Sequence, residues 1–148
     1  MQDRFLVRLA RAGDLDAILE IEHASFGKDA YDRNLFAEYL RKCGGLFLVA
    51  RRGARICGYV VTCTRENRAE LVSIAVLPEL RGRRVASAML ESMLRRLKRR
   101  RVARLVLMVR VRNRAARRFY EKFGFEKLRI VKGYYQGAGD GLLMERKL

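Results

Sequence analysis

The sequence predicts a single mixed α/β domain over residues 1–148, and three observations support this prediction. The length of 148 residues is that of one ordinary domain. Half of the residues are hydrophobic and a third are charged, which is typical of a folded chain. The period of the apolar residues is first helical, then strand-like, and then alternates between the two. We therefore expect the order β-α-α-β-β-β-α-β-α-β-β, with a mixed sheet that carries helices on both faces.

The first half of the chain is expected to form a strand, two helices and a hairpin. Asp14 and Asp32 are candidate N-caps, because a short acidic side chain can accept hydrogen bonds from the amides of a first helical turn. Gly53 lies in a short turn between two apolar runs, which indicates a hairpin. The expected elements are strand 5–9, helix 14–26, a helix from residue 32, strand 46–51 and strand 56–64.

The second half is expected to alternate strands with helices. Pro78 ends a strand, and the following helix repeats apolar residues every fourth position. Asn113 is a candidate N-cap, and Gly124 stands where a helix of that length needs its C′ glycine. The expected elements are strand 70–76, helix 82–100, strand 103–111, helix 113–124, and strands 125–131 and 142–148.

The net charge of +17 is large for this length. Such a surface attracts anions, among them nucleic acid, acidic peptides and phosphorylated cofactors. No apolar run approaches the ~20 residues that span a bilayer, and the first residues lack the apolar core of a signal peptide. We therefore expect a cytoplasmic protein with no membrane partner.

The cysteines and the histidine do not suggest a metal site. Cys43, Cys57 and Cys63 are an odd number without the spacing of metal ligands. We expect them to be reduced and buried, as small apolar residues in a reducing compartment. His23 is the single histidine and lies in the first expected helix. No metal is expected.

The segment 71–94 has the pattern of a phosphate-binding loop. A strand ends, a turn rich in glycine and arginine follows, and a helix begins. Free amides at a helix N-terminus, together with the helix dipole, favour an anion. Arg81, Arg83 and Arg84 add positive charge that suits the oxygens of a pyrophosphate. Taken alone, the segment could equally be a solvated basic turn.

Two motifs in this order resemble those of the GNAT superfamily of N-acetyltransferases. The family's phosphate loop, Arg/Gln-x-x-Gly-x-Gly/Ala, is matched at Arg81 and Ala86 but not at Arg84, where the family usually has glycine. The second motif, Asn-x-x-Ala-x-x-x-Tyr-x-x-x-Gly-Phe, is matched from Asn113 to Phe125 without a departure. A capped amphipathic helix would explain Asn113 and Gly124 equally well, but not both motifs at this separation.

The resemblance implies the GNAT acyl-CoA N-acyltransferase fold and acetyl-CoA as the acetyl donor. In the family, the strand before the phosphate loop pairs with the pantetheine arm, so Ile74 and Val76 would offer backbone groups to that arm. The residues implied in acetyl-CoA binding are Ile74, Ala75, Val76, Arg81, Gly82, Arg83, Arg84, Val85, Ala86, Ser87, Asn113 and Tyr120.

The resemblance also implies catalytic roles. The family's tyrosine stands near the sulfur of the cofactor, so Tyr120 is the candidate acid that protonates the departing thiolate. Many related enzymes carry a base at the position of Met108, and methionine cannot act as one. Glu70 is the alternative base, since a two-residue period places it on the face of Ile74 and Val76. It could also be an exposed carboxylate that balances nearby arginines.

The expected acceptor is the α-amino group of a protein N-terminus. Two segments resemble the peptide-binding loops of ribosomal-protein alanine acetyltransferases and archaeal N-terminal acetyltransferases, and they contain Phe26, Tyr31, Tyr134 and Tyr135. The tyrosine pair could instead serve hairpin packing. The basic surface suggests acidic residues downstream of the N-terminus, and ribosomal proteins are candidate partners.

The sequence is also compatible with other acceptors and with a nucleic-acid-binding role. The acceptor could be a lysine side chain, a polyamine or an aminoglycoside, although a basic enzyme repels polycations. The run Arg95-Arg-Leu-Lys-Arg-Arg-Arg101 could belong to a nucleic-acid-binding or ribosome-binding module. Cations are also favourable at the end of a helix, and the run has no interleaved stacking aromatics. A specific nucleic-acid ligand is therefore not expected.

Overall fold

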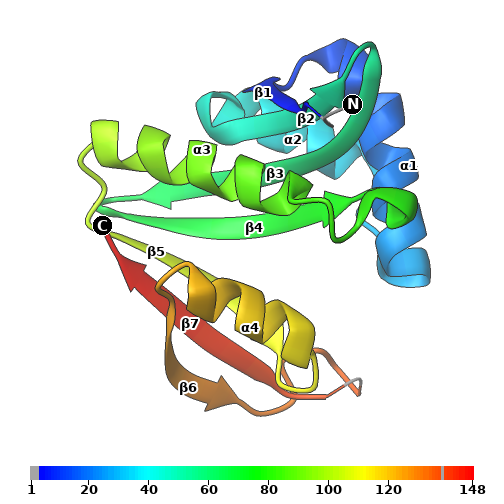
Figure 1. The fold of residues 1–148 in the computed structure, drawn as a ribbon. Coiled ribbons are helices and arrows are strands. Elements are labelled where there is room, and N and C mark those ends of the chain that lie inside the picture. The colour runs from blue at the N-terminus through cyan, green and yellow to red at the C-terminus, as the bar shows by residue number, and fades with distance from the viewer. Residues whose placement is uncertain (1–3, 138) are drawn as a thin grey trace.

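The computed structural model describes residues 4–137 and 139–148 and has the expected mixed α/β architecture (Figure 1). Seven strands form one sheet in the order β1-β2-β3-β4-β5-β7-β6. The strands are β1 (Leu6–Leu9), β2 (Phe47–Arg52), β3 (Arg55–Arg65), β4 (Arg68–Val76), β5 (Arg104–Arg110), β6 (Glu126–Val131) and β7 (Gly141–Lys147). The α-helices are α1 (Leu15–Phe26), α2 (Arg33–Cys43), α3 (Val85–Arg99) and α4 (Arg114–Lys122).

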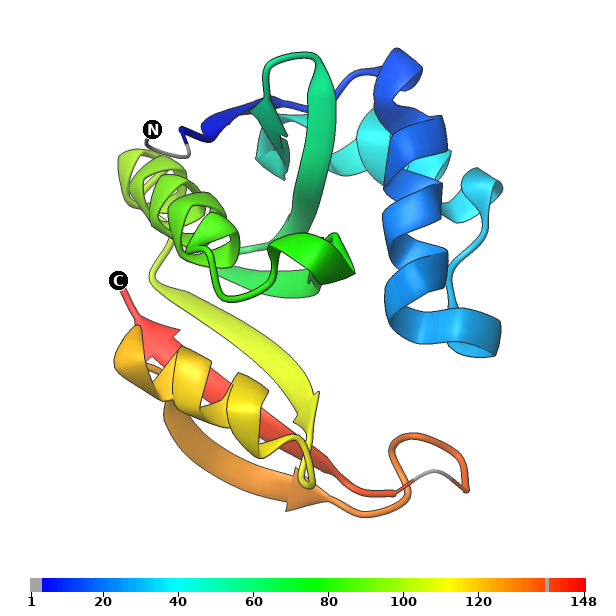
Figure 2. The ribbon, with the colours of Figure 1, turned by 45° about the vertical axis from the view of Figure 1, so that its right-hand side comes forward.

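The helices cover the sheet on both faces (Figures 1 and 2). α1 and α2 pack on one face of the β2–β4 region, and α3 packs on the other. α4 lies over the C-terminal strands β5 and β7. The core between α2 and the sheet is aromatic, since the rings of Phe36, Phe47 and Tyr59 contact one another at centroid distances of 5.4–6.4 Å. Burial of these large rings stabilises the packing of α2 on the sheet.

The sheet opens between β4 and β5. These two strands are the parallel pair of the sheet, and they are paired at Arg68–Arg104, Ala69–Leu105 and Glu70–Val106. Beyond Glu70 the strands diverge, as Figures 1 and 2 show, while β5 stays paired with β7 along its length. The carboxyl-terminal halves of β4 and β5 are therefore the two arms of a V.

Most predicted helix ends are confirmed. The side chains of Asp32 and Asn113 accept hydrogen bonds from the amides of Leu35 and Ala116, at 2.9 and 3.1 Å. Asp14 precedes α1, but the predicted capping bond is wrong. Its carboxylate instead accepts from the amide of Arg11 and pairs with Arg8 of β1. The nearby arginine of the first strand outcompetes the amides of the helix, since charged hydrogen bonds are the stronger ones.

The cysteine prediction is wrong for two of the three residues. Cys43 at the end of α2 and Cys63 in β3 form a disulfide, with their Cα atoms 5.3 Å apart. Cys57 is buried and free, as expected. The packing of α2 across β3 brings two cysteines together that are 20 residues apart, and no local pattern in the sequence records that contact.

Removal of this disulfide is expected to lower the free energy of unfolding by about 3 kcal/mol, because it closes a loop of 20 residues in the unfolded chain. For a domain of this size the melting temperature would fall by roughly 6–12 °C. Calorimetry of the double variant Cys43→Ser, Cys63→Ser tests this. Dithiothreitol should lower the wild-type melting temperature to that of the variant and leave the variant unchanged. Equal melting temperatures for wild type and variant, each with and without dithiothreitol, would contradict a stabilising disulfide.

A β-bulge in β4 changes the predicted face of Glu70. Thr62 pairs with Leu71 and Val61 pairs with Ser73, so Val72 is an extra residue in β4. Glu70 lies opposite Cys63, whose sulfur is bonded to α2. Glu70 therefore lies on the α1–α2 face of the sheet.

Val76 lies on the other face. It is opposite Gly58, where an added Cβ would lie 2.9 Å from Met89 of α3. Directly paired residues share a face of the sheet. The prediction that Glu70 shares a face with Ile74 and Val76 is wrong, because the bulge shifts the two-residue period by one position.

Candidate active site

The loop between β4 and α3 presents free amides to one end of the V. A short 3-10 turn, Pro78–Leu80, follows β4, and Gly82 and Arg84 then adopt positive φ angles of 82° and 65°. These angles delay the helix, which begins at Val85 and not at residue 82 as predicted. Within the described chain, the amides of Val85, Ala86 and Ser87 donate no hydrogen bond to a backbone carbonyl. They are thus available to an anion, at the positive end of the helix dipole.

Arg84 has the left-handed conformation that glycine adopts without cost (φ 65°, ψ 17°). This explains why the family usually has glycine at this position. A non-glycine residue there costs about 1–2 kcal/mol. Arg84 thus adds a third positive charge to the loop and also adds this backbone strain.

We expect Arg84→Gly to be more stable than Arg84→Ala by about 1 kcal/mol, because glycine removes the strain but raises the entropy of the unfolded chain. Both substitutions remove the same charge, so the difference isolates the backbone. The matched pair is Arg83→Gly and Arg83→Ala, since the φ angle of Arg83 is not positive. There alanine should be the more stable substitution. Urea unfolding of the four variants measures this, and the same order at both sites would contradict strain at Arg84.

The backbone of β4 is directed into the opening of the V. The amide of Leu77 bonds to the carbonyl of Cys57 on β3, at 2.9 Å. Since backbone groups of alternate residues point to the same neighbour, Ala75 also faces β3, and Ile74 and Val76 face the gap on the β5 side. Among the described residues, the pairing of β4 with β5 ends at Glu70, so Ile74 and Val76 are not paired with β5. Their N–H and C=O groups suit an extended ligand that pairs like a strand.

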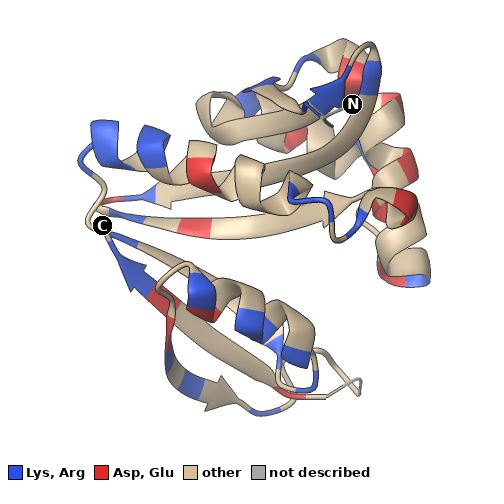
Figure 3. Cartoon of the chain, in the orientation of Figure 1, with Lys and Arg blue, Asp and Glu red and all other residues tan. Residues whose placement is uncertain are grey.

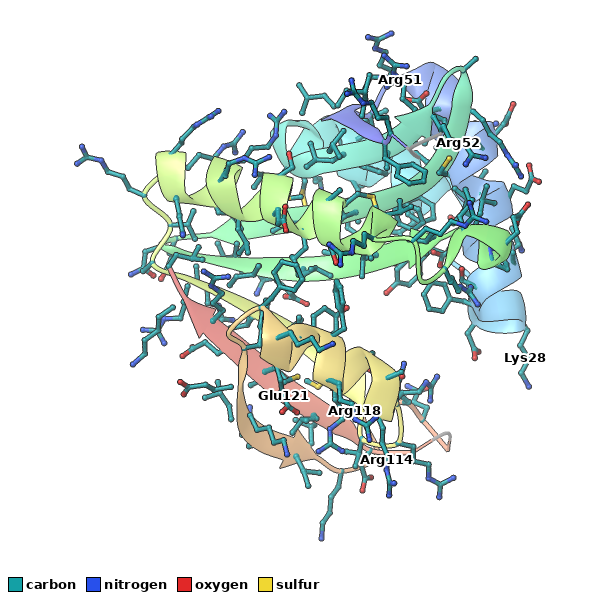
Figure 4. The ribbon with its side chains drawn as sticks, viewed as in Figure 1. Lys28, Arg51, Arg52, Arg114, Arg118 and Glu121 are labelled. Atoms are coloured by element: carbon teal, nitrogen blue, oxygen red, sulfur yellow. A yellow bond between two sulfur atoms is a disulfide. The ribbon has the colours of Figure 1, made fainter. Side chains whose placement is uncertain are left out.

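Tyr120 lies on the inner face of α4, on the opposite arm. Its side chain is 8% exposed and packs between the rings of Phe119 and Phe125, at centroid distances of 5.4 and 5.5 Å. Figure 4 shows Arg114, Arg118 and Glu121 on the outer side of the same helix. Burial, and then the nearby Tyr135, raise the pKa of Tyr120 well above its usual value of 10. The phenol is therefore protonated at neutral pH and can donate a proton.

Three tyrosines from the two segments predicted to bind the acceptor lie near one another, together with Tyr39 of α2. Tyr31 precedes α2, and its ring lies 6.4 Å from that of Tyr39. Tyr134 and Tyr135 follow β6, and their ring centroids lie 4.9 Å apart. Burial raises the pKa of Tyr31, and Tyr39, Glu22, Tyr134 and Glu70 add to this effect. The two segments are therefore close enough to interact.

The charge of Glu70 acts on two of these tyrosines. Glu70 is exposed, and its charge contributes, after burial, to a raised pKa for both Tyr31 and Tyr39. Its position on the α1–α2 face thus brings it to the predicted acceptor side. Tyr39 was not predicted as a site residue, because in the sequence it belongs to the apolar side of α2. Phe26, the remaining predicted residue, is 42% exposed at the end of α1.

Arg110 joins the two acceptor segments and was also not predicted. Its guanidinium lies 4.1 Å from the ring centroid of Tyr135, within cation–π distance. It also lies 4.0 Å from the carboxylate of Asp29, in the turn after α1. Such an arginine could have been suspected from its position at the end of a strand that leads into the second motif. Met108, two residues earlier, lies beside Gly141, and the Cβ atom of Tyr134 is next to the same glycine.

Other surfaces lie away from this site. The basic run 95–101 ends α3, at the opposite end of that helix from the phosphate loop, as the blue segments in Figure 3 show. A hollow of about 450 Å³ lies between the end of α4 and β7 and is lined by charged residues such as Lys122 and Arg146. It contains none of the predicted site residues. Among the described residues, no helix is long and apolar enough to cross a membrane.

Comparisons with known proteins agree with the two motifs. The family model described as Acetyltransferase (GNAT) family matches residues 15–125. An N-alpha-acetyltransferase of Saccharolobus solfataricus is 32% identical over 157 aligned positions, which cover 97% of this chain and 93% of that protein. The ribosomal-protein-S18-alanine N-acetyltransferase of Escherichia coli is 26% identical, with a TM-score of 0.86 and coverage of 97% and 94%. Ard1 of Thermoplasma volcanium is 23% identical, with a TM-score of 0.92 and 97% coverage of each chain, and supports the fold alone.

Proposed function

Because the chain belongs to the GNAT acetyltransferase family, we propose that it transfers the acetyl group of acetyl-CoA to the α-amino group of protein N-termini. The observation that carries the acceptor is the group of tyrosines Tyr31, Tyr39 and Tyr134, the first two of which are close enough to Glu70 for its charge to raise their pKa. Tyrosine side chains line a peptide slot well, because a flat apolar ring ends in a polar hydroxyl. Relatives named as N-alpha-acetyltransferases support the same acceptor.

The residues of the V suit acetyl-CoA. The free amides of Val85, Ala86 and Ser87, with Arg81, Arg83 and Arg84, would hold the pyrophosphate. Ile74, Ala75 and Val76 belong to the part of β4 that borders the V. The N–H and C=O groups of Ile74 and Val76, which face the gap, would pair with the pantetheine of the cofactor. Asn113 and Tyr120 lie on the opposite side. Acetyl-CoA supplies the thioester carbonyl that the amine attacks.

Direct transfer needs three groups from the chain. Glu70 takes the proton of the attacking amine, directly or through a water molecule, as the N–C bond forms. A backbone N–H near Val76 donates to the oxyanion. Tyr120 donates a proton to the sulfur as the C–S bond breaks. An α-amino group has a pKa of about 8, against about 10.4 for lysine, so a weak base suffices for the N-terminus.

Acetylation of peptides with free and blocked N-termini, followed by mass spectrometry, tests the proposal. We expect the acetyl group on the α-nitrogen of free N-termini, and no product from blocked peptides. Transfer to blocked peptides through a lysine side chain would change the acceptor. Transfer to polyamines or aminoglycosides but to no peptide would reject the proposed acceptor.

Acidic residues just after the N-terminus are expected to increase the rate, because the net charge of +17 favours anionic partners. In matched peptides that differ only in positions three to five, kcat/KM should be higher for acidic than for basic sequences at low salt. The difference should shrink above about 0.5 M salt, where charges beyond roughly 4 Å are screened. Equal kcat/KM values for the acidic and basic peptides at low salt would contradict this preference. The same holds for peptides taken from ribosomal proteins.

A further inference from the structure

A buried carboxylate of α1 has no part in the chemistry proposed above. Glu22 is 2% exposed, one turn before the end of the helix. A buried carboxylate is costly without hydrogen-bond donors. Oε2 of Glu22 accepts from the backbone amide of Tyr31 at 2.9 Å, and Oε1 accepts from the hydroxyl of Tyr59. The carboxylate thus closes the nine-residue segment that leads to Tyr31.

The hydroxyl of Tyr59 extends this connection to β4. Tyr59 is buried in β3, and its hydroxyl lies 2.8 Å from Oγ of Ser73, which is buried in β4. Ser73 immediately precedes the residues proposed to contact the pantetheine arm. A continuous chain of hydrogen bonds therefore runs from the acceptor loop to the strand of the acetyl donor.

Other contacts support the same segment in a different way. Ring contacts with Phe36 and Tyr39, at 6.0 and 6.4 Å, hold the side chain of Tyr31, whereas Glu22 holds its backbone. Arg81 of the phosphate loop donates a hydrogen bond of 3.1 Å to Ser25, near the end of α1. The end of α1 is thus connected to the donor side at two places.

We propose that Glu22, Tyr59 and Ser73 are positioning residues, which fix the backbone of Tyr31 and thereby set the acceptor wall relative to β4. This inference rests on the proposed peptide acceptor. The three residues touch neither reacting atom. Their loss should therefore weaken acceptor binding equally in the ground state and the transition state, which raises the KM for peptide and leaves kcat nearly unchanged.

The test is Tyr59→Phe, which removes one hydroxyl and keeps the ring contacts with Phe36 and Phe47. We expect the KM for peptide to rise roughly 5–30-fold, the effect of one or two kcal/mol, while kcat and the KM for acetyl-CoA stay within about twofold. Ser73→Ala, which keeps Glu22 bonded to Tyr59, should have a smaller effect.

Two further comparisons separate positioning from stability. Thr62→Val removes another buried hydroxyl of β3, on the opposite face, whose oxygen has no hydrogen-bond partner among the described residues. It should leave the KM for peptide unchanged. Glu22→Gln keeps an acceptor for the amide of Tyr31, so its KM for peptide should rise less than that of Glu22→Ala. Circular dichroism and melting temperatures confirm folding of each variant.

The outcomes distinguish this inference from the proposed function. If wild type acetylates peptides but Tyr59→Phe and Thr62→Val have equal peptide KM values, the positioning role is wrong. A fall in kcat at unchanged KM would also overturn it. If wild type acetylates no peptide, the proposed acceptor fails, whatever the variants do. Increased peptide KM in Tyr59→Phe, with partial recovery in Glu22→Gln over Glu22→Ala, supports it.

Discussion

Tyr120→Phe is expected to lower kcat about 10²–10⁴-fold, which is the usual contribution of a positioned general acid. The substitution removes the hydroxyl and keeps the ring between Phe119 and Phe125, so the packing of α4 should survive. The KM values for peptide and acetyl-CoA should change little, since the lost interaction acts as the C–S bond breaks. Steady-state kinetics on one free N-terminal peptide measures the effect.

The pH dependence of wild type gives an independent check. Because the pKa of Tyr120 is raised, the acid form persists throughout the neutral range and no alkaline decline of kcat from this residue is expected below about pH 10. Tyr135→Phe is the matched control, because it removes a neighbouring phenol from the acceptor side. A loss of kcat as large in Tyr135→Phe, or none in Tyr120→Phe, would remove Tyr120 from the role of acid.

Glu70→Gln is expected to lower kcat/KM roughly 10–100-fold at pH 7, where only about a tenth of an α-amine with pKa ~8 is unprotonated. The defect should shrink as the pH rises to 9, because the amine then reaches the site already deprotonated. The ratio of wild-type to variant kcat/KM between pH 6.5 and 9.5 tests this. The amide keeps the shape of the side chain and removes its basicity.

Glu66→Gln provides the control, since Glu66 is another exposed carboxylate, in the turn between β3 and β4, outside the acceptor region. It should leave the pH profile unchanged. A defect in Glu70→Gln that is constant from pH 6.5 to 9.5 would indicate a contribution to binding and not to proton removal. No defect at all would return Glu70 to the role of a carboxylate that balances nearby arginines.

The fold was predictable because its signals are local. Among the described residues, the change of apolar period located every α-helix and strand but none of the short 3-10 turns. The caps Asp32 and Asn113 are confirmed by hydrogen bonds within three residues. Gly124 has the positive φ angle, 86°, that a residue after a helix needs. Errors at element ends are one to three residues. The largest is at α3, where residues 82–84 form the phosphate loop and not the first helical turn.

The site was predictable only in part, because its geometry depends on contacts between distant segments. A single bulge at Val72 moved Glu70 to the other face, and the two-residue period of a strand contains no sign of it. Tyr39 lies on the acceptor side because α2 packs near Tyr31, and Arg110 lies there because the segment between β6 and β7 places Tyr135 beside it. The disulfide likewise depends on where α2 crosses β3.

The pairing between β4 and β5 is short, and we expect the two parts of the sheet on either side of it, β1–β4 and β5–β7, to behave as separate cooperative units. Three residue pairs join β4 to β5, whereas β5 and β7 are paired at seven positions. β6 is the edge strand of the C-terminal part of the sheet, and its residues are exposed except for a half-buried Val131. Amides of this unit should exchange with solvent through openings that leave β2–β4 folded. Tyr120 and the phosphate loop belong to different units, so catalytic alignment is only as persistent as this narrow junction.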